Sequence, residues 1–291
     1  MTAPALDPPR SLSRFAEDLR RAPFSTLAEA ASRLGYAARG VVYLCIGAVA
    51  LAAALDRVPR AEGALAALEA LGDWPFGQAL LWLTGLGLYG FAGWRALQSV
   101  FDADGQGRSA KALANRLGQA ISGVVYGSMA VSVFALLDAA EDLGEADDRA
   151  KTQESVRALL DAPGGELWVM GLGLFVFGAG VGNIVQAFVR DFGKRLTTRG
   201  HPRRWAVWAG RIGYFARGIA FLPLGVFFFR AGFGARTEEA TGLGGALQAL
   251  EAQPFGGALL AGVALGLAAF GLFALVEARY RRLQIEEAVN P

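Results

Sequence analysis

The sequence predicts an all-α, polytopic membrane protein with six transmembrane helices, arranged as three parallel two-helix repeats in a pseudo-threefold bundle. Three observations lead to this fold class. The 291-residue chain is 54% hydrophobic and 19% charged, whereas a soluble domain carries about 25% charged residues. The charges are clustered, so six stretches are almost free of them, and each is about as long as the ~20 residues that cross a bilayer. The third observation is a motif that recurs three times along the chain.

The expected spans are six apolar segments, with approximate bounds 36–55, 75–97, 117–137, 166–189, 212–231 and 255–276. A helix that is apolar on every face has no solvated side, which favours lipid over water as its surroundings. In lipid, helices satisfy their backbone amides segment by segment. Before the first span, residues 12–33 can form a basic amphipathic helix on the membrane surface or a disordered basic tail, and the sequence leaves both open.

The first, third and fifth spans begin with the same motif. Arg33–Tyr43 reads RLGYAARGVVY, Arg116–Tyr126 reads RLGQAISGVVY, and Arg211–Phe221 reads RIGYFARGIAF. Because fixed-period self-similarity indicates a repeat architecture, each motif is expected to open one structural unit.

The even spans also correspond to one another. Each begins at a proline that follows a short Ala- and Leu-rich segment, and these segments are 64–71, 156–160 and 246–250. Such a segment is expected to be a helix in the outer interface, ended by the proline that starts the next span. A unit with two spans returns to its starting side, so the repeats share one orientation, unlike inverted transporter repeats.

The chain is therefore expected to consist of five segments. These are a basic N-terminal cytoplasmic segment (1–32), three repeats of two spans each (33–104, 115–192 and 210–282) and a C-terminal tail (283–291).

The distribution of charge predicts the orientation in the membrane. With six spans, 21 of the 28 basic residues fall on the side that holds both termini. Because Lys and Arg in short loops stay in the cytoplasm, both termini are expected to be cytoplasmic in a protein of the cell (inner or plasma) membrane. The basic inner face is expected to contact anionic lipid headgroups, not nucleic acid. The outer loops hold 16 of the 26 acidic residues, which either attract cations or a basic partner or simply keep the loops soluble.

The Arg-x-Gly-Tyr-x-x-Arg-Gly motif, followed by a Gly-rich even span, resembles the domain of unknown function 1206 family of bacterial membrane proteins. That family is similarly described as repeated pairs of transmembrane helices, and the resemblance covers about residues 33–282. The middle repeat departs from the motif, with Gln119 in place of the tyrosine and Ser122 in place of the second arginine. The resemblance implies an architecture and no activity.

Two arginines, Arg39 and Arg217, are expected about one turn inside the inner membrane boundary. Charges in a membrane are costly and usually have partners. The nearest candidates are the polar residues at the inner ends of the even spans, Gln98, Gln186 and Glu277, because odd helices begin where even helices end. The alternatives are that each guanidinium reaches a lipid phosphate, or that the arginines form a ligand or phosphate site.

Glycines are frequent in the even spans, and two pairs have the spacing that lets helices approach closely: Gly178 with Gly182, and Gly262 with Gly266. We expect these glycines to pack helices together; the alternative is that they form hinges or a narrow permeation path. The aromatic residues near span ends are expected to form an interfacial belt; they are Tyr36, Tyr43, Tyr126, Tyr214, Trp74, Trp168, Trp205 and Trp208.

The residues needed for chemistry are scarce, with one cysteine and one histidine in the chain. No nucleophile motif, phosphate loop or metal-ligand set is recognisable, so no catalytic, cofactor or metal site is expected. The sequence favours a non-enzymatic membrane protein that acts as a scaffold or as an accessory to a membrane complex. The alternative is a channel or transporter for ions or small solutes along the pseudo-threefold axis, which the absence of charged residues in the middle of the spans disfavours.

Overall fold

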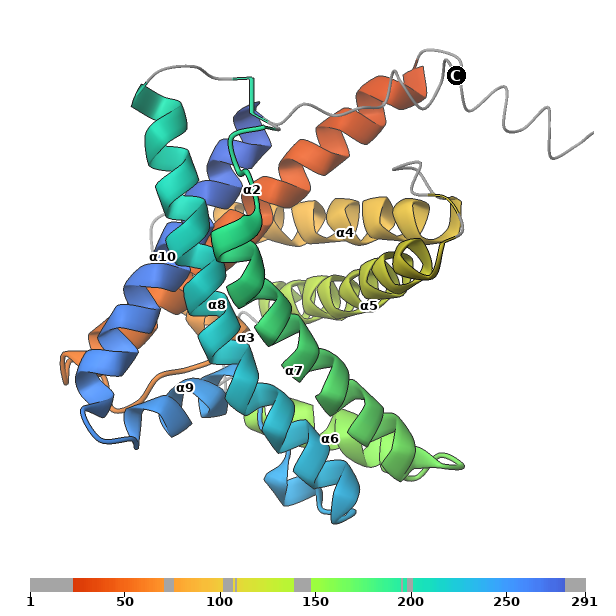
Figure 1. The fold of residues 1–291 in the computed structure, drawn as a ribbon, viewed down its shortest axis with the longest axis vertical. Helices are drawn as coiled ribbons and strands as arrows, with labels where there is room; N and C mark the ends of the chain where they lie inside the picture. The colour runs from red at the N-terminus through yellow and green to blue at the C-terminus, as the bar shows by residue number, and fades with distance from the viewer. Residues whose placement is uncertain are drawn as a thin grey trace, which may run out of the picture.

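The computed structural model describes residues 23–70, 76–101, 107, 109–138, 148–194, 196–197 and 201–280. Within these residues all the secondary-structure elements are helices (Figure 1), which confirms the all-α class. The first helix, α2, spans Pro23–Ala54 and is 32 residues long. The segment before the first expected span is therefore helical from Pro23 onward, and the rest of the expected N-terminal segment lies outside the described residues.

Among the described helices, five are long and apolar enough to cross a membrane. They are α2, α5 (Ala110–Asp138), α7 (Gly165–Val189), α8 (His201–Phe233) and α10 (Gly256–Tyr280). The second expected span is α4 (Gly77–Phe101), whose 25 residues also suffice in length. It is not among those five, and its sequence includes Trp82, Thr84, Tyr89 and several glycines.

A short helix precedes each even span, as the Ala- and Leu-rich segments predict. These helices are α3 (Ala64–Glu69), α6 (Asp148–Leu160) and α9 (Leu243–Glu251), and a 3-10 turn, η1 (Thr237–Glu239), precedes the last of them. Pro163 and Pro254 lie in the turns directly before α7 and α10. The corresponding Pro75 lies outside the described residues.

The long helices associate in three close pairs, in which the second long helix of one repeat lies along the first long helix of the next. The pairs are α4 with α5, α7 with α8, and α10 with α2. Packing of α2 against α4 and of α8 against α10 joins the pairs, as Figure 1 shows for the central part of the molecule. The last of the described long helices therefore packs on the first of them. In the cyclic order α2, α4, α5, α7, α8, α10, each long helix packs on the next, except that α5 and α7 do not form a packed interface.

Glycines allow the backbones to approach where the pairs are closest. A Cβ on Gly40 of α2 would lie 3.0 Å from the Gly271 carbonyl oxygen of α10, and a Cβ on Gly271 would lie 2.7 Å from the Gly40 carbonyl oxygen. Between α7 and α8, a Cβ on Gly218 would lie 2.7 Å from the Gly180 carbonyl oxygen, and one on Gly225 would lie 2.5 Å from the Phe177 nitrogen. Only glycine leaves room for these contacts, in the way that small residues promote helix association in membranes.

Two substitutions in the middle repeat explain why α5 and α7 do not pack together. In the first repeat a Cβ on Gly87 would lie 2.7 Å from the Ala38 Cβ, and in the third Gly266 meets Ala216 in the same way. The residues at the matching positions of the middle repeat are Phe175 and Ile121. A phenyl ring opposite an isoleucine cannot enter a space that a glycine and an alanine fill, so the two helix backbones stay apart.

The remaining contact between α5 and α7 is slight. A Cβ added to Gly118 would lie 3.8 Å from the Phe175 Cζ atom, at ordinary van der Waals distance. The α5 and α7 spans are also the least buried of the five, with 22% of each inside the protein against 50% for α2 and α10. The middle repeat thus exposes more of its helices than the other two.

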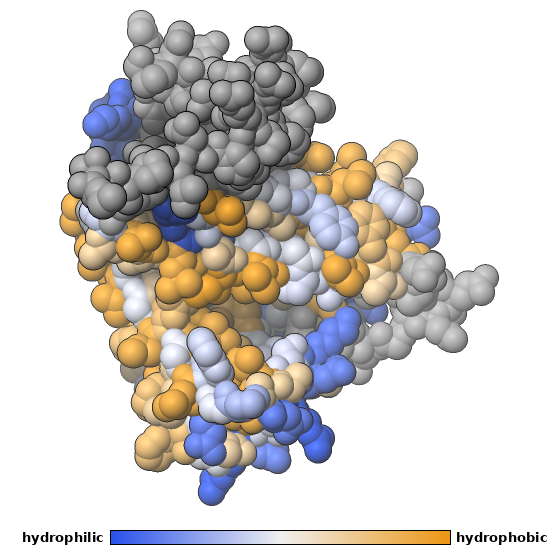
Figure 2. Space-filling view, turned by 90° about the vertical axis from the view of Figure 1, so that its right-hand side faces the viewer, coloured by the Kyte–Doolittle hydropathy of each residue, from blue (hydrophilic) through white to orange (hydrophobic). Residues whose placement is uncertain are grey.

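The outer surface of the long helices is strongly apolar. Large side chains that stand largely exposed include Val124 and Leu117 on α5, and Trp168, Leu174 and Phe188 on α7. In Figure 2 hydrophobic residues cover most of the visible face, and hydrophilic ones gather toward its lower edge. A soluble monomer rarely exposes contiguous apolar patches beyond a few hundred Å², so this surface suits the hydrocarbon of a bilayer.

Candidate functional site: a buried cluster of arginine and aromatic residues

An ion pair joins the first and last long helices inside the protein. The Arg39 Nη2 atom on α2 lies 3.5 Å from the Glu277 Oε2 atom on α10, and the two side chains are 5% and 4% exposed. Arg39 lies in the middle of α2 and Glu277 in the last turn of α10, so the packing of these two helices brings together two residues far apart in sequence. A guanidinium buried in an apolar span needs such a counter-charge. Of the three expected partners, the carboxylate is the one that forms an ion pair with Arg39.

Aromatic rings surround the Arg39 guanidinium. Its Cζ atom lies 4.7 Å from the ring centroid of Phe270, 5.5 Å from that of Tyr36 and 5.8 Å from that of Phe91. At such distances the negative face of a ring attracts the cation, and the interaction is strongest where water is excluded. The arginine is therefore held by rings from α4 and α10 as well as by Glu277.

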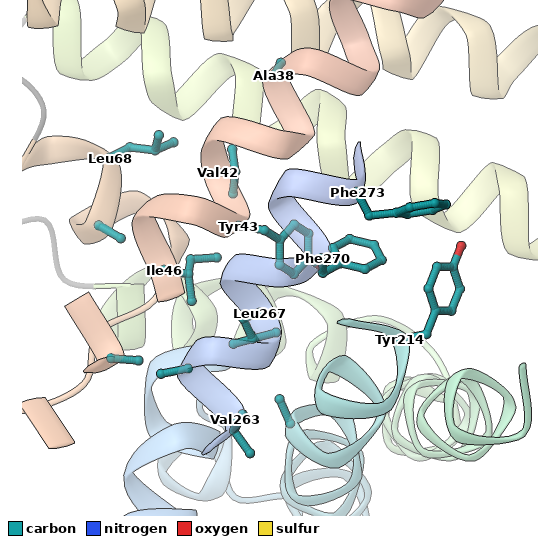
Figure 3. Close-up of a cluster of buried hydrophobic side chains, with 14 of the residues drawn as sticks. Ala38, Val42, Tyr43, Ile46, Leu68, Tyr214, Val263, Leu267, Phe270 and Phe273 are labelled. Carbon is teal, nitrogen blue, oxygen red and sulfur yellow. The ribbon is translucent and has the colours of Figure 1, made fainter. Parts of the chain in front are cut away.

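The second intramembrane arginine, Arg217 of α8, has different surroundings. Its Cζ atom lies 4.7 Å from the ring centroid of Phe221, 5.1 Å from that of Phe270 and 5.6 Å from that of Tyr43. The side chain is half-buried, and its buried Nε has no hydrogen-bond acceptor among the described residues. No ion pair joins it to a described carboxylate. Phe270 thus lies beside both arginines (its position next to Tyr43 is visible in Figure 3).

The other predicted inner-end residues have different roles. Gln98 is buried, 2% exposed, and its Oε1 accepts a hydrogen bond of 3.1 Å from Arg95 Nη1. Gln186 instead stands exposed on α7, where its Oε1 lies 3.5 Å from Arg190 Nη1. Gln186 therefore does not join the cluster, because its side of α7 faces away from the bundle interior.

The tyrosines are the main correction to the predicted aromatic belt. Tyr36, Tyr43, Tyr126 and Tyr214 are all buried, each less than one tenth exposed. They pack edge-on against Phe91 of α4 or Phe270 of α10. The ring centroids of Tyr43 and Phe270 are 4.6 Å apart. The corresponding distance for Tyr126 and Phe91 is 5.0 Å. Nearness to a span end predicts depth in the membrane but not the direction in which a side chain points.

The described tryptophans of the predicted belt are exposed, and their place relative to a membrane interface stays a prediction. Trp168, Trp205 and Trp208 are exposed by 65%, 76% and 59%. Trp74 lies outside the described residues. Residues that the sequence analysis missed complete the cluster: Arg95, with its Cζ atom 4.9 Å from the Phe91 ring, and Arg190, which donates a 2.7 Å hydrogen bond to the Tyr214 hydroxyl. Phe91 and Phe270 occupy the same position in the first and third repeats. This correspondence could have indicated from the sequence that both rings belong to the cluster.

Three of the four glycines predicted to pack helices do not do so within this chain. A Cβ on Gly178, Gly182 or Gly262 would meet no described atom within 4 Å. Gly266 does pack, against Ala216. The spacing of a glycine pair shows that both lie on one helix face but does not say which neighbour that face meets, and the close α7–α8 contact uses Gly173 and Gly180 instead.

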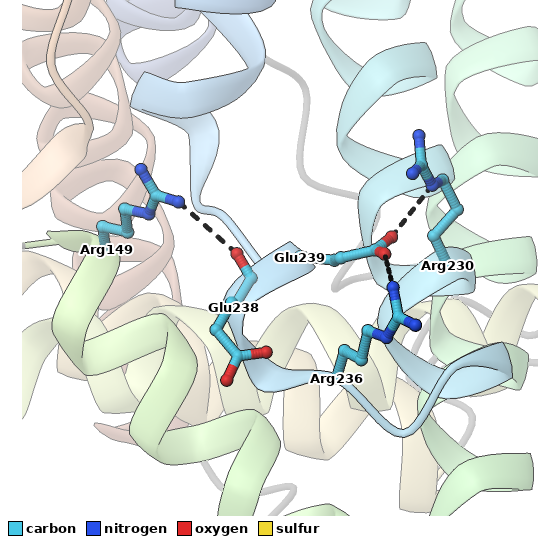
Figure 4. Close-up of polar contacts among 5 residues, drawn as sticks. All are labelled: Arg149, Arg230, Arg236, Glu238 and Glu239. Carbon is cyan, nitrogen blue, oxygen red and sulfur yellow. Dashed lines mark hydrogen bonds and ion pairs between the residues drawn. The ribbon is translucent and has the colours of Figure 1, made fainter.

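A second polar group lies around η1, at the end of α8. Glu239 accepts from Arg230 Nε at 2.9 Å and lies 3.6 Å from Arg236 Nη1, and Arg149 of α6 donates to the Glu238 backbone carbonyl at 3.4 Å (Figure 4). A cavity of about 230 Å³ adjoins these side chains. The ion pairs are largely exposed, and exposed pairs contribute little to stability.

Within the described ranges no group of three His, Cys, Asp or Glu residues could hold a metal ion. Cys45 is a half-buried free thiol on α2. The inner cluster offers cationic and hydrogen-bonding groups. It can attract an anion or lock helices together.

The repeats, the long apolar helices and the exposed apolar surface define a helical membrane protein built from repeated helix pairs. The model of the family described as Domain of Unknown Function (DUF1206) matches the chain three times, over residues 34–102, 117–190 and 212–281. The chain belongs to this family. An uncharacterized protein of Bacillus subtilis (strain 168), YxxB, is 31% identical over 267 residues, which are 88% of this chain and 92% of that protein. No solved structure matches the chain.

Proposed function

We propose that this protein is a non-enzymatic scaffold or accessory subunit of a membrane complex, with six spans and both termini in the cytoplasm of the cell's inner or plasma membrane. The sixth span is α4, which pairs along its length with α5, one of the five apolar spans. The distribution of basic residues supports the orientation, since 21 of 28 lie on the side of the termini.

The arrangement of helix pairs supports a pseudo-threefold bundle. The three close pairs are equivalent under the repeat, since each joins an even helix to the odd helix of the next unit. Matching positions of the odd helices would then form layers around the axis. The layers are Tyr36, Gln119 and Tyr214; Arg39, Ser122 and Arg217; and Tyr43, Tyr126 and Phe221.

The observation that carries the scaffold role is that aromatic and aliphatic side chains fill the region where an axial path would run. Phe91 and Phe270 are fully buried there, and Tyr43 and Tyr126 pack on them. Protein interiors packed in this way leave few voids larger than a water molecule. A channel or transporter along this axis, the alternative function, would need polar or hydrated space in the same place.

The surface left for partners is on the middle repeat. Its helices are less buried than those of the other repeats, and Gly171, Gly178 and Gly182 lie on the side of α7 that meets no described atom. Small residues on a lipid-facing helix allow another helix to approach closely.

Photo-crosslinking in intact membranes tests this role. A photoreactive residue replaces Leu174 on α7, and the matched control replaces Leu272 on the exposed side of α10. The proposal predicts a discrete protein adduct from position 174 and adducts with lipid alone from position 272. Lipid adducts alone at both positions would contradict a scaffold that binds partners through this face.

A further inference from the structure

The charges of the inner cluster do not balance. Of its arginines, Arg95 and Arg190 donate hydrogen bonds to Gln98 and Tyr214. Arg39 and Arg217, which lie beside the same Phe270 ring, contribute two further positive charges, and Glu277, which pairs with Arg39, contributes one negative charge. Arg217 meets three rings and no described acceptor or carboxylate. A buried donor without an acceptor is costly, and a charged one more so. Arg217 therefore lacks a counter-ion among the described residues.

The two guanidinium groups share one ring. Their Cζ atoms lie 4.7 and 5.1 Å from the Phe270 centroid. Arg39 also keeps a buried Nε without an acceptor in the described part of the chain. Two like charges in a medium of low dielectric repel each other. An anion between or beside them attracts both and offsets this repulsion. Arginine is the residue best suited to this, since its planar fork matches a phosphate or a carboxylate.

The cluster lies at a depth that a lipid headgroup can reach. Arg217 is six residues further along α8 than Arg211, which places it about 9 Å deeper along the helix axis. Arg211 is exposed and stacks near Trp208, an exposed residue of the interfacial belt. The long arginine side chain can extend from this depth toward a phosphate at the inner interface.

The middle repeat leaves this level of the bundle open on one side. Its position equivalent to Arg39 and Arg217 is Ser122, so a third guanidinium is missing there. The same repeat is the one in which Phe175 and Ile121 keep α5 and α7 apart. The middle repeat therefore departs from the other two both at the arginine position and at the contact between its two long helices. These departures remove a cation from this level and leave the neighbouring helices unpacked.

We propose that Arg217, with Arg39 beside it, binds a phosphate group that enters between α5 and α7. The group belongs to an anionic phospholipid headgroup or to free phosphate, which share this chemistry. The inference goes beyond the scaffold role and does not depend on it, because a scaffold can act with this site empty.

Calorimetric titration of the purified full-length protein, in a detergent and buffer free of phosphate, tests the proposal. The probes are dihexanoylphosphatidic acid, inorganic phosphate and, as a lipid without phosphate, dioctanoylglycerol. The key variant is Arg217→Gln, and its matched control is Arg211→Gln, an exposed arginine on the same helix. We expect phosphatidic acid to bind the wild type and the control equally, and Arg217→Gln to bind it roughly tenfold or more weakly, as expected for the loss of a charged hydrogen bond.

The two sources give different patterns. If inorganic phosphate binds as tightly as phosphatidic acid, with the same dependence on Arg217, the ligand is free phosphate. If phosphatidic acid alone binds, it is a lipid headgroup. Equal losses in the Arg217 and Arg211 variants would mean adsorption to the basic face and would overturn the proposal, as would equal binding of dioctanoylglycerol or no binding of either phosphate.

A second variant covers the case in which Arg217→Gln does not fold. Ser122→Arg restores the third arginine of the layer on the open side. We expect it to bind the same phosphate probe roughly tenfold more tightly than the wild type, because it adds one charged donor. An unchanged or weaker affinity would contradict an anion site at this level.

Discussion

The buried ion pair between α2 and α10 predicts a specific pattern of energetic coupling. Arg39→Met keeps most of the side-chain volume and removes the charge, and Glu277→Gln does the same on the other side. Both side chains are about 95% buried, so no discount for solvent screening applies. Removing one partner of a buried pair leaves the other charge uncompensated, which typically costs about 3–5 kcal/mol.

The geometry places the expected values at the lower end of that range. The nitrogen and oxygen are 3.5 Å apart and form no hydrogen bond, and three rings continue to stabilise Arg39 when Glu277 is neutral. We expect each single change to destabilise the protein by about 3 kcal/mol. The double change leaves no unpaired charge, so it should cost about 3–4 kcal/mol, which corresponds to a coupling of about 2–3 kcal/mol.

The assay is reversible unfolding in mixed micelles, with the free energy of unfolding measured for the wild type, both single variants and the double variant. The matched control is the exposed pair Arg60 and Glu62, whose atoms lie 3.8 Å apart on the outer side. Its cycle should show a coupling below about 0.5 kcal/mol. Additive losses for Arg39 and Glu277 would refute the reasoning, because they would mean that the two charges do not stabilise each other.

Two further predictions concern packing and use the same unfolding assay. Gly225→Leu should destabilise the protein by about 3 kcal/mol or more, because a Cβ there would already lie 2.5 Å from the α7 backbone. The free energy of unfolding of Gly178→Leu should lie within about 0.5 kcal/mol of the wild-type value, since no described atom stands near its added Cβ. Equal effects of these two changes would show that the α7–α8 interface is misassigned. Phe270→Ala should cost about 3–5 kcal/mol, because it empties a fully buried site beside both arginines; the exposed Leu272→Ala should be nearly neutral, and a small loss for Phe270→Ala would contradict its place in the core.

The local architecture was predictable because it depends on patterns that are local in sequence. Apolar segments of about 20 residues predict spans, and the Ala- and Leu-rich segments before the prolines of the even spans predict the short helices α3, α6 and α9. The ion pair of Arg39 was within reach of the same reasoning. Odd helices begin where even helices end, so the inner-end residues were the natural partners.

The rest depends on which way each helix face points, and one sequence does not contain that information directly. Gly178 and Gly182 have the spacing of packing residues and still face away from the described chain, whereas Gly173 and Gly180, on the opposite side of the same helix, make the close contact. The buried tyrosines illustrate the same limit. The separation of α5 from α7 was readable in principle, since Phe175 and Ile121 replace a glycine and an alanine of the other repeats.

The central claim is that aromatic packing closes the axis of this bundle, and solute flux through the purified protein tests it most directly. Vesicles of phosphatidylcholine and phosphatidylglycerol, loaded with potassium ions and a small neutral solute, are compared with and without reconstituted protein. The account predicts equal leak rates. Protein-dependent flux that a bulkier axial side chain abolishes, as in Tyr126→Trp, would contradict it and would favour a channel or transporter.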